Sequence, residues 1–405
     1  MQVNLSIKIF SERINLFLKR ISIFVLFSFS FYFYACSDNP SSIGADLLKN
    51  DYLNINELDS YKDTLAQTSS YLKRSIKLGS GYRLFVGKTE NVEASSLINF
   101  NIPLSDSIKS GIKADSIIII GAKIRFTRDY TFGDNNSSYD FTVHKIQSGW
   151  TSAGFTSDSL SMLSYDPADI SFNKKLTDST DEFEIDKDLA FSWLKYSTDS
   201  LGNNYGIYIK PTESSQKIVG YNALYSTGDS TEPVLSIVLE RPGRYVDSLI
   251  FSGYSDVSAV SGNIPAVTQS NIIVQGGLVV NAKLWFDVSK VPFNAVINTA
   301  EVTLNLDSSK TFIGDTTSTI LAAFLTDSSS IVLDSSVVVT FSRTHNYMTG
   351  TITSFVKKWV DSKINQGILL FPRSEISNLD LFTIRGSNAA DSLKPRLHII
   401  YTTKK

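Results

Sequence analysis

The chain has 405 residues, with 38 Lys and Arg against 40 Asp and Glu and a single cysteine, Cys36. Four of the basic residues and one acidic residue precede Cys36, so the remainder carries a net charge of about −5. That charge argues against a nucleic-acid-binding surface, which needs a concentrated basic face. With no second cysteine, an exported form of the chain would contain no internal disulfide and would depend on its hydrophobic core.

The N-terminal region has the order of an export signal. Its first 20 residues carry four basic side chains and one acidic side chain. An apolar run over residues 21–35 follows, long enough for a signal core and shorter than the ~20 residues of a membrane-spanning helix. The run ends on Ala35, directly before Cys36.

This order resembles the signal of bacterial lipoproteins, in which the cysteine thiol is diacylated, the signal is removed and the cysteine becomes the new N-terminus. The resemblance implies a signal peptide over residues 1–35 and lipidation of Cys36. Acyl chains would give a stable anchor, since each buried CH₂ contributes about 0.8 kcal/mol. A plain secretory signal and a single-helix anchor are the alternatives. Ser37 is compatible with sorting to the outer membrane, so we expect the outer membrane or cell surface of a diderm bacterium.

Residues 36–59 lack clear periodicity and predict, after the lipidated cysteine, a flexible tether. Beyond it, the same order of strand signals occurs twice, over residues 60–240 and 246–405. Apolar residues alternate over 97–103 and 121–127 in the first half, and over 282–288 and 300–306 in the second. This period of two is typical of half-buried strands.

Each half continues with one helical pattern and a Pro-led closing strand. The helical patterns lie at Leu189–Tyr196 and Ile352–Val360, where apolar residues recur at helical spacing. From the glycine of the following turn to the proline of the last strand there are 27 residues in the first half (206 to 233) and 28 in the second (367 to 395). Many short strands with one helix per half predict an all-β fold of two tandem jelly-roll-like β-sandwiches, with the seam at residues 241–244.

The order of these signals is similar to a known family. The matching positions are residues 84–87, Phe100, 121–122, 143–146, Trp150, Trp193, 204–207, 224–226 and 233–235, then 284–287, Trp359, 366–369, 382–384 and 395–397. Together they resemble the DNRLRE repeat, a jelly-roll β-sandwich of exported bacterial and archaeal proteins. Some members of that family bind polysaccharides such as alginate. The resemblance therefore implies a non-catalytic module that binds polysaccharide, and a structural or adhesion lipoprotein that binds another protein is the alternative.

The chain offers little that indicates catalysis. Of its three histidines, His144 and His398 lie in alternating strand patterns and His345 lies in an expected loop. Neither a zinc-binding His-Glu-x-x-His nor a Gly-x-Ser-x-Gly motif is present. A glycosidase could work with two carboxylates, which sequence alone cannot pair. We expect no enzyme activity, no cofactor and no nucleic-acid partner, and the sequence leaves a protein partner open.

A cluster of oxygen-bearing side chains lies between two expected strands: Asp129, Asp134, Asn135, Asn136 and Asp140. Ca²⁺ takes six to eight oxygen ligands, so Asp129, Asp134, Asn136 and Asp140 are the candidates for such an ion. Asp and Asn are also ordinary turn formers, and the spacing does not fit an EF-hand loop. The prediction is therefore turn chemistry and no metal.

Trp285 is the aromatic residue that the pattern singles out for binding. Leu284 and Phe286 occupy the inward face of their strand, so Trp285 points the other way, where it could stack on a sugar ring or pack beneath a loop. Asn99 holds the matching place in the first half, and Tyr205 and Tyr208 lie near the first repeated turn. These four residues are the candidate ligand contacts, whereas Trp150, Trp193 and Trp359 are expected in the core.

Overall fold

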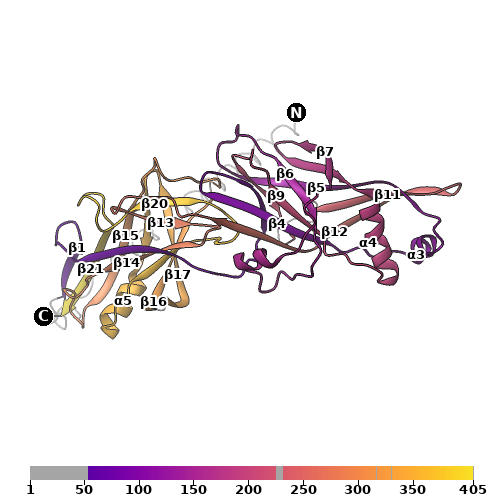
Figure 1. Cartoon of the computed structure of the whole chain (residues 1–405). Helices are drawn as coiled ribbons and strands as arrows, with labels where there is room; N and C mark the ends of the chain where they lie inside the picture. Colours follow the sequence, from indigo (N-terminus) through magenta and orange to yellow (C-terminus); the bar gives the residue numbers. More distant parts are fainter. Residues whose placement is uncertain (1–52, 225–230, 316, 330, 405) are drawn as a thin grey trace, which may run out of the picture. The chain divides into compact units, whose positions relative to one another are not determined.

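Two large antiparallel sheets dominate the fold of the described residues (Figure 1). The computed structural model describes residues 53–224, 231–315, 317–329 and 331–404. Among these residues, 56–401 belong to one compact unit. The predicted all-β sandwich fold is confirmed, whereas the number of domains stays a prediction. Within the described residues, no helix has both the length and the apolar character needed to span a membrane.

Sheet I is the ten-stranded sheet, and it takes its strands from the first part of the chain. Its order is β10-β3-β4-β12-β11-β5-β8-β7, with β9 on β4 and β6 on β9. Because β10 pairs with both β3 and β5, the order closes on itself. The strands are β3 (Arg83–Lys88), β4 (Val92–Phe100), β5 (Ile118–Phe132), β6 (Phe141–Lys145), β7 (Ser171–Leu176), β8 (Thr180–Ile185), β9 (Ile207–Pro211), β10 (Ile218–Asn222), β11 (Val234–Arg241) and β12 (Tyr245–Gly262).

Sheet II is the eleven-stranded sheet, and it combines the end of the chain with two strands from the beginning. Its order is β1-β21-β15-β18-β17-β16-β19-β14-β13-β20, with β2 on β14. The strands are β1 (Leu53–Asp59), β2 (Gln67–Lys73), β13 (Asn271–Gln275), β14 (Val280–Phe286), β15 (Val296–Asn305), β16 (Ile320–Asp327), β17 (Val332–Thr344), β18 (Tyr347–Thr351), β19 (Ile368–Pro372), β20 (Leu381–Arg385) and β21 (Arg396–Lys404).

Two of the helices are the predicted ones. α4 (Lys187–Asp199) begins at Asp186, whose carboxylate accepts hydrogen bonds from two backbone N–H groups of the first turn. α5 (Thr353–Ser362) is its counterpart in the second half. The sequence analysis did not predict α3 (Asp106–Lys113) or the 3₁₀ helix η1 (Ser157–Met162): α3 buries only two large apolar side chains, Ile108 and Ile112, and η1 buries none.

Each sheet folds over its own apolar core. Alternate residues of the strands point inward, and each long helix adds one tryptophan: Trp193 from α4 and Trp359 from α5, both 1% exposed. The two therefore lie in the core as predicted. Large fully buried side chains of this kind contribute most to folding, because the hydrophobic free energy scales with the apolar area removed from water.

Strand pairing crosses the domain boundaries that we expected at residues 60, 240 and 246. The expected seam is the tight turn of a hairpin, in which Arg241 pairs with Tyr245 and Gly243 has φ +73°. β12 therefore belongs to sheet I, although it lies beyond the seam. The start of the chain is different as well, since β2 pairs with β14 of sheet II.

The end of the expected tether is also structured, because residues 53–59 form β1. Asp59 is buried, and its carboxylate accepts hydrogen bonds from Arg396 Nε (3.0 Å) and Nη2 (2.5 Å). The segment has few apolar residues and is held by a partner 337 positions away, so its order could not be predicted from its own residues. The remainder of the tether, residues 36–52, lies outside the described residues.

Candidate functional site

The same turn enters the strand after the helix in both halves. Asn204 accepts a hydrogen bond from Gly206 N (3.2 Å) and donates to the carbonyl of Phe100 (3.1 Å). In the second half, Asn365 accepts from Gly367 N (3.0 Å) and donates to the carbonyl of Phe286 (2.7 Å). The turn therefore ties the start of β9 to β4, and the start of β19 to β14.

Both turn glycines are required by geometry. Gly206 has φ +79° and Gly367 has φ +85°, a region that side chains rarely adopt. A Cβ on Gly206 would lie 2.0 Å from the carbonyl oxygen of Ile98, and one on Gly367 would lie 2.3 Å from that of Leu284. The turn therefore packs directly on the backbone of the neighbouring strand.

Trp285 is fixed by this turn. Its Nε1 donates to the carbonyl of Asn365 (3.1 Å), and the side chain is half-buried. Asn99 holds the matching position, as predicted, and its Nδ2 donates to the carbonyl of Asn204 (3.0 Å). The first half thus has an amide where the second half has an indole, and the indole adds a large aromatic face at the same place.

The indole of Trp285 lines a pocket of about 510 Å³, which we call the Trp285 pocket. Residues of the loop after β14 and of the end of α5 form the rest of its lining. Phe293, 60% exposed, offers a second aromatic ring, and Lys363 Nζ lies 5.0 Å from the centre of that ring. The lining residues are Trp285, Asp287, Val288, Ser289, Val291, Pro292, Phe293, Trp359, Val360, Lys363 and Asn365.

The polar groups of this pocket are suited to hydrogen bonding. Asp287 Oδ1 accepts from Ser289 N (2.9 Å), and this bond, together with the Ser289 hydroxyl, holds the pKa of the carboxyl below its usual range. Asp287 is thus an anionic acceptor at neutral pH, and Lys363 is a cationic donor. Lys363 takes up the left-handed conformation that ends α5. Sequence reasoning missed Phe293 and Lys363, which only the packing of loop and helix brings to Trp285.

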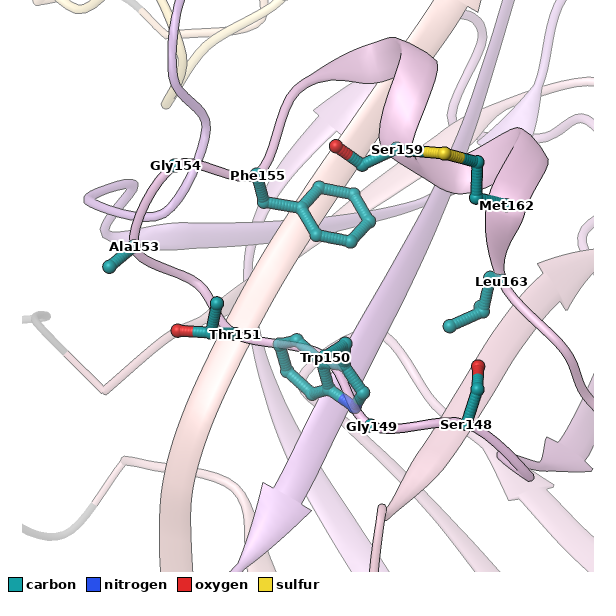
Figure 2. A pocket seen from close by; sticks show the side chains of 10 residues that line it. All are labelled: Ser148, Gly149, Trp150, Thr151, Ala153, Gly154, Phe155, Ser159, Met162 and Leu163. Atoms are coloured by element: carbon teal, nitrogen blue, oxygen red, sulfur yellow. The ribbon is translucent and has the colours of Figure 1, made fainter.

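A second pocket, of about 220 Å³, lies beside η1, and we call it the Trp150 pocket (Figure 2). Trp150 is half-buried: it packs against a buried apolar cluster that includes Phe155, as expected of a core residue, and it also lines this pocket. Its Nε1 donates to the carbonyl of Tyr205 (2.8 Å), which again is a carbonyl of the repeated turn. Figure 2 shows the rings of Trp150 and Phe155 with Met162 and Leu163 around the hollow. Its lining carries no charged side chain.

The two tyrosine candidates do not form a ligand surface. Tyr208 is 5% exposed and packs against the rings of His144 and Tyr165, so the prediction that it contacts a ligand is not supported by its position. Tyr205 is half-buried in the same cluster, and its carbonyl is the acceptor for Trp150. The structure therefore brings Trp285 to a pocket, whereas Asn99, Tyr205 and Tyr208 have structural contacts.

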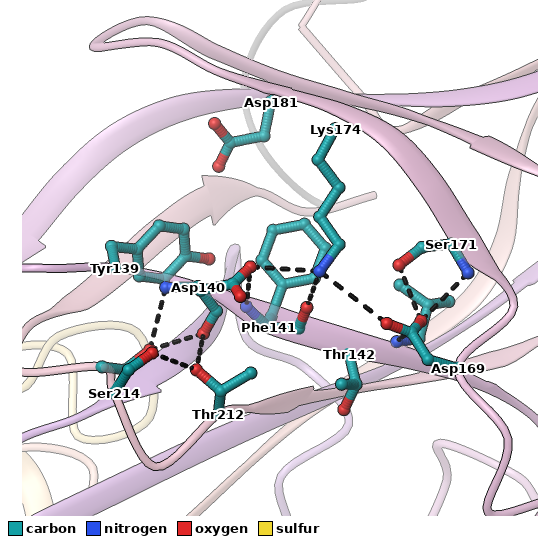
Figure 3. Close-up of polar contacts among 12 residues, drawn as sticks. Tyr139, Asp140, Phe141, Thr142, Asp169, Ser171, Lys174, Asp181, Thr212 and Ser214 are labelled. Atoms are coloured by element: carbon teal, nitrogen blue, oxygen red, sulfur yellow. Dashed lines mark hydrogen bonds and ion pairs between the residues drawn. The ribbon is translucent and has the colours of Figure 1, made fainter.

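Of the four calcium candidates, Asp129 and Asp140 are paired with cations, and Asp134 and Asn136 belong to a turn in which one bonds to the other. Asp129 accepts from Arg83 Nε at 2.7 Å, and Asp134 accepts from the backbone N–H of Asn136 at 3.0 Å. Asp140 lies 3.0 Å from Lys174 Nζ, which also contacts Asp169 (Figure 3). Throughout the described ranges, no three acidic, His or Cys side chains lie close enough together to hold a metal ion.

The histidines have structural partners or lie outside the pockets. His144 is buried, with Nε2 2.8 Å from Thr142 Oγ1 and Nδ1 within 3.1 Å of two backbone carbonyls. His345 lies in the exposed turn between β17 and β18, with φ +51°. None of the three histidines lines the Trp285 or the Trp150 pocket. Cys36, the expected site of lipidation, lies outside the described residues.

Comparisons with known proteins do not assign the chain to a family. No family model matches the chain, and no curated protein matches it. The solved structure BspA_C_mut matches over 84% of this chain and 90% of its own, at 10% sequence identity and a TM-score of 0.16. A TM-score this low carries no argument about fold or function.

Proposed function

We propose that the protein is an exported lipoprotein, anchored through Cys36 at the outer membrane or cell surface, that binds polysaccharide without transforming it. The Trp285 pocket is the proposed binding site. The resemblance to the DNRLRE repeat supports the class of ligand, and the lining of the Trp285 pocket supports the choice of site.

The single observation that carries this proposal is the composition of the Trp285 pocket. Two aromatic rings, Trp285 and Phe293, lie beside one anionic and one cationic group, Asp287 and Lys363. The flat apolar face of a sugar ring stacks on aromatic side chains, and its hydroxyls exchange hydrogen bonds with charged and amide groups. Among the described residues that line the pocket, Asp287 is the only carboxylate, whereas glycoside hydrolysis ordinarily uses a pair.

Binding through a few stacking contacts and hydrogen bonds is expected to be weak. An aromatic contact contributes about 0.5–1.5 kcal/mol beyond the area it buries, so a few contacts give modest affinity. An anchored protein gains from many copies on one surface, because a long polysaccharide can engage several at once and the second event is effectively intramolecular.

The test is electrophoresis through gels that contain alginate or one of several neutral and acidic polysaccharides. We expect at least one polysaccharide to retard the wild type, and Trp285→Ala or Phe293→Ala to abolish the retardation. Trp150→Ala is the matched control, because it removes an indole bonded to the same kind of turn in the other pocket. Absence of retardation by every polysaccharide, or equal retardation of the Trp285→Ala variant, would refute the sugar site. Cys36→Ser tests the anchor separately, since it should move the protein from the membrane to the soluble fraction.

The Trp150 pocket favours a second candidate function, the binding of another protein. It is smaller than the usual 300 Å³ or more of a small-molecule site, uncharged, and bordered by Met162, which is 78% exposed. A pocket of this kind suits a single apolar side chain of a partner, and methionine adapts to different shapes. Crosslinking in intact cells, compared between wild type and Met162→Asp, tests it: a specific adduct lost in the variant supports adhesion to a protein.

A further inference from the structure

Each repeated half begins with a leading strand that precedes its matched strands. In the first half β2 precedes β3, and the nine residues 74–82 separate them. In the second half β12 precedes β13, and the eight residues 263–270 separate them. The two leading strands therefore occupy equivalent places in the sequence.

Both leading strands pair with the central strand of the other half. β2 runs antiparallel to β14, with Tyr71 opposite Ala282. β12 runs antiparallel to β4, with Ser258 opposite Ser96. β4 and β14 are equivalent, because each has a turn glycine packed on it and the next strand, β9 or β19, along the same edge. By this match, Ser96 corresponds to Ala282.

The residues at the start of each leading segment (β1 to β2 in the first half, β12 in the second) also pair with the other half. The first part of β12 pairs with β11, the last strand of the first half, with Phe251 opposite Leu235. Ser60, directly after β1, donates through its backbone N–H to the carbonyl of Leu397 in β21 (2.9 Å), the last strand of the second half. Each half therefore gives its leading segment to the last and central strands of the other.

We infer that the two halves exchange their leading strands, so that each sandwich is completed by a strand of the other repeat. This is the geometry of domain swapping, here within one chain. Without the exchange, β2 would pair with β4 and β12 with β14. Tyr71 would then lie opposite Ser96, and Ser258 opposite Ala282.

The exchange makes the shape of the Trp285 pocket depend on both repeats, although its lining comes from the second alone, and this step rests on the proposed function. Thr68 of β2 lies opposite Trp285. Just beyond it, the carbonyl of Ala66 accepts from Asp287 N (2.8 Å), and the carbonyl of Asp63 accepts from Lys290 Nζ (2.7 Å). The leading segment of the first repeat thus positions the loop that lines the pocket in the second.

Disulfide trapping in the full chain tests the exchange without any ligand. A Cys36→Ser background removes the chain's own thiol. The Oγ atoms of Ser96 and Ser258 lie 3.5 Å apart, so Ser96→Cys with Ser258→Cys should form an intramolecular disulfide on oxidation. Tyr71→Cys with Ala282→Cys is the equivalent pair in the other sheet, and it covers the case in which the first pair does not fold.

The control is the pair that the unexchanged chain would join, Tyr71→Cys with Ser96→Cys. We expect it to stay reduced in the monomer, whereas the exchanged pairs oxidise to monomers two mass units lighter. An intramolecular disulfide in the control pair, or none in either exchanged pair when circular dichroism shows native strands, would overturn the inference. Because no glycan is involved, this failure would be distinct from failure of the proposed function.

Discussion

Substitution of the turn glycines gives a sharp test of how the repeated turn stabilises each half. Gly206→Ala and Gly367→Ala each combine two costs. The first is the left-handed backbone, which costs a residue with a Cβ about 1–2 kcal/mol. The second is the contact of the new Cβ with a strand carbonyl, at 2.0 Å from Ile98 O or 2.3 Å from Leu284 O. To relieve this contact the turn must move away from β4 or β14. We expect the move to cost about 1–3 kcal/mol, as overpacking of a core does.

Gly202 separates the two costs. Its φ is +88°, nearly the same as at the turn glycines, but a Cβ there would meet nothing within 4 Å. Gly202→Ala should therefore lower the free energy of unfolding by about 1 kcal/mol, and Gly206→Ala by about 3 kcal/mol. Urea titrations followed by tryptophan fluorescence and circular dichroism measure the difference. Equal losses for Gly202→Ala and Gly206→Ala would refute the close approach of turn and strand.

Two buried carboxylates give further predictions. Burial raises the pKa of Asp256 to about 6, so its contribution to stability is full below pH 3.8 and is lost as the pH rises through 6. The free energy of unfolding of Asp256→Asn should therefore rise relative to wild type by up to about 3 kcal/mol between pH 4 and pH 7. Urea titrations at each pH measure the difference. A difference that does not change with pH would contradict this prediction. Asp181 is fully buried and accepts two hydrogen bonds from Arg128 (2.6 and 2.9 Å). Asp181→Asn should cost about 3–5 kcal/mol, because it leaves a buried guanidinium unpaired. Glu182→Gln, on the exposed side of the same strand, should cost under about 1 kcal/mol, and similar losses would contradict the buried pair.

The sequence predicted those parts of the fold that local patterns determine. Alternation identified β4 and β14 from their last residues, Ile98–Phe100 and Leu284–Phe286, where buried and half-buried side chains alternate; most of the earlier residues of both strands are buried on both faces. Helical spacing identified α4 and α5 in the same way. The turn at Gly206 and Gly367 was predicted as well, since an Asn side chain that bonds the backbone two residues on is local chemistry.

Strand partners could not be predicted in the same way. β4 and β14 present equivalent edges, so nothing in the sequence of β2 says which of them it joins. The choice depends on linkers and on contacts far apart in the chain. The buried end of the expected tether is a second case, because Asp59 is held by Arg396, from the other end of the chain.

The same distinction between local patterns and long-range contacts applies to the candidate site residues. Strand parity placed Trp285 outside the core, where it lines a pocket. It could not supply Phe293 or Lys363, which come from a loop and a helix end. The acidic cluster was predicted as turn chemistry, with calcium as the alternative; the cations that pair with Asp129 and Asp140, Arg83 and Lys174, lie far away in the sequence and could not be predicted.

The repeated turn explains how one framework can present two different pockets. β9 pairs with β4 on one edge and with β6 on the other, and β19 likewise lies between β14 and β16. Trp285 approaches its turn from β14, whereas Trp150 approaches from the loop after β6, so the two indoles reach the turn from opposite edges. Each indole donates to a carbonyl of the turn. Trp285 lines a pocket that contains charged groups, whereas Trp150 lines a pocket without them. The same turn geometry thus supports two different pockets, and a chain with one such turn would offer only one of the two chemistries.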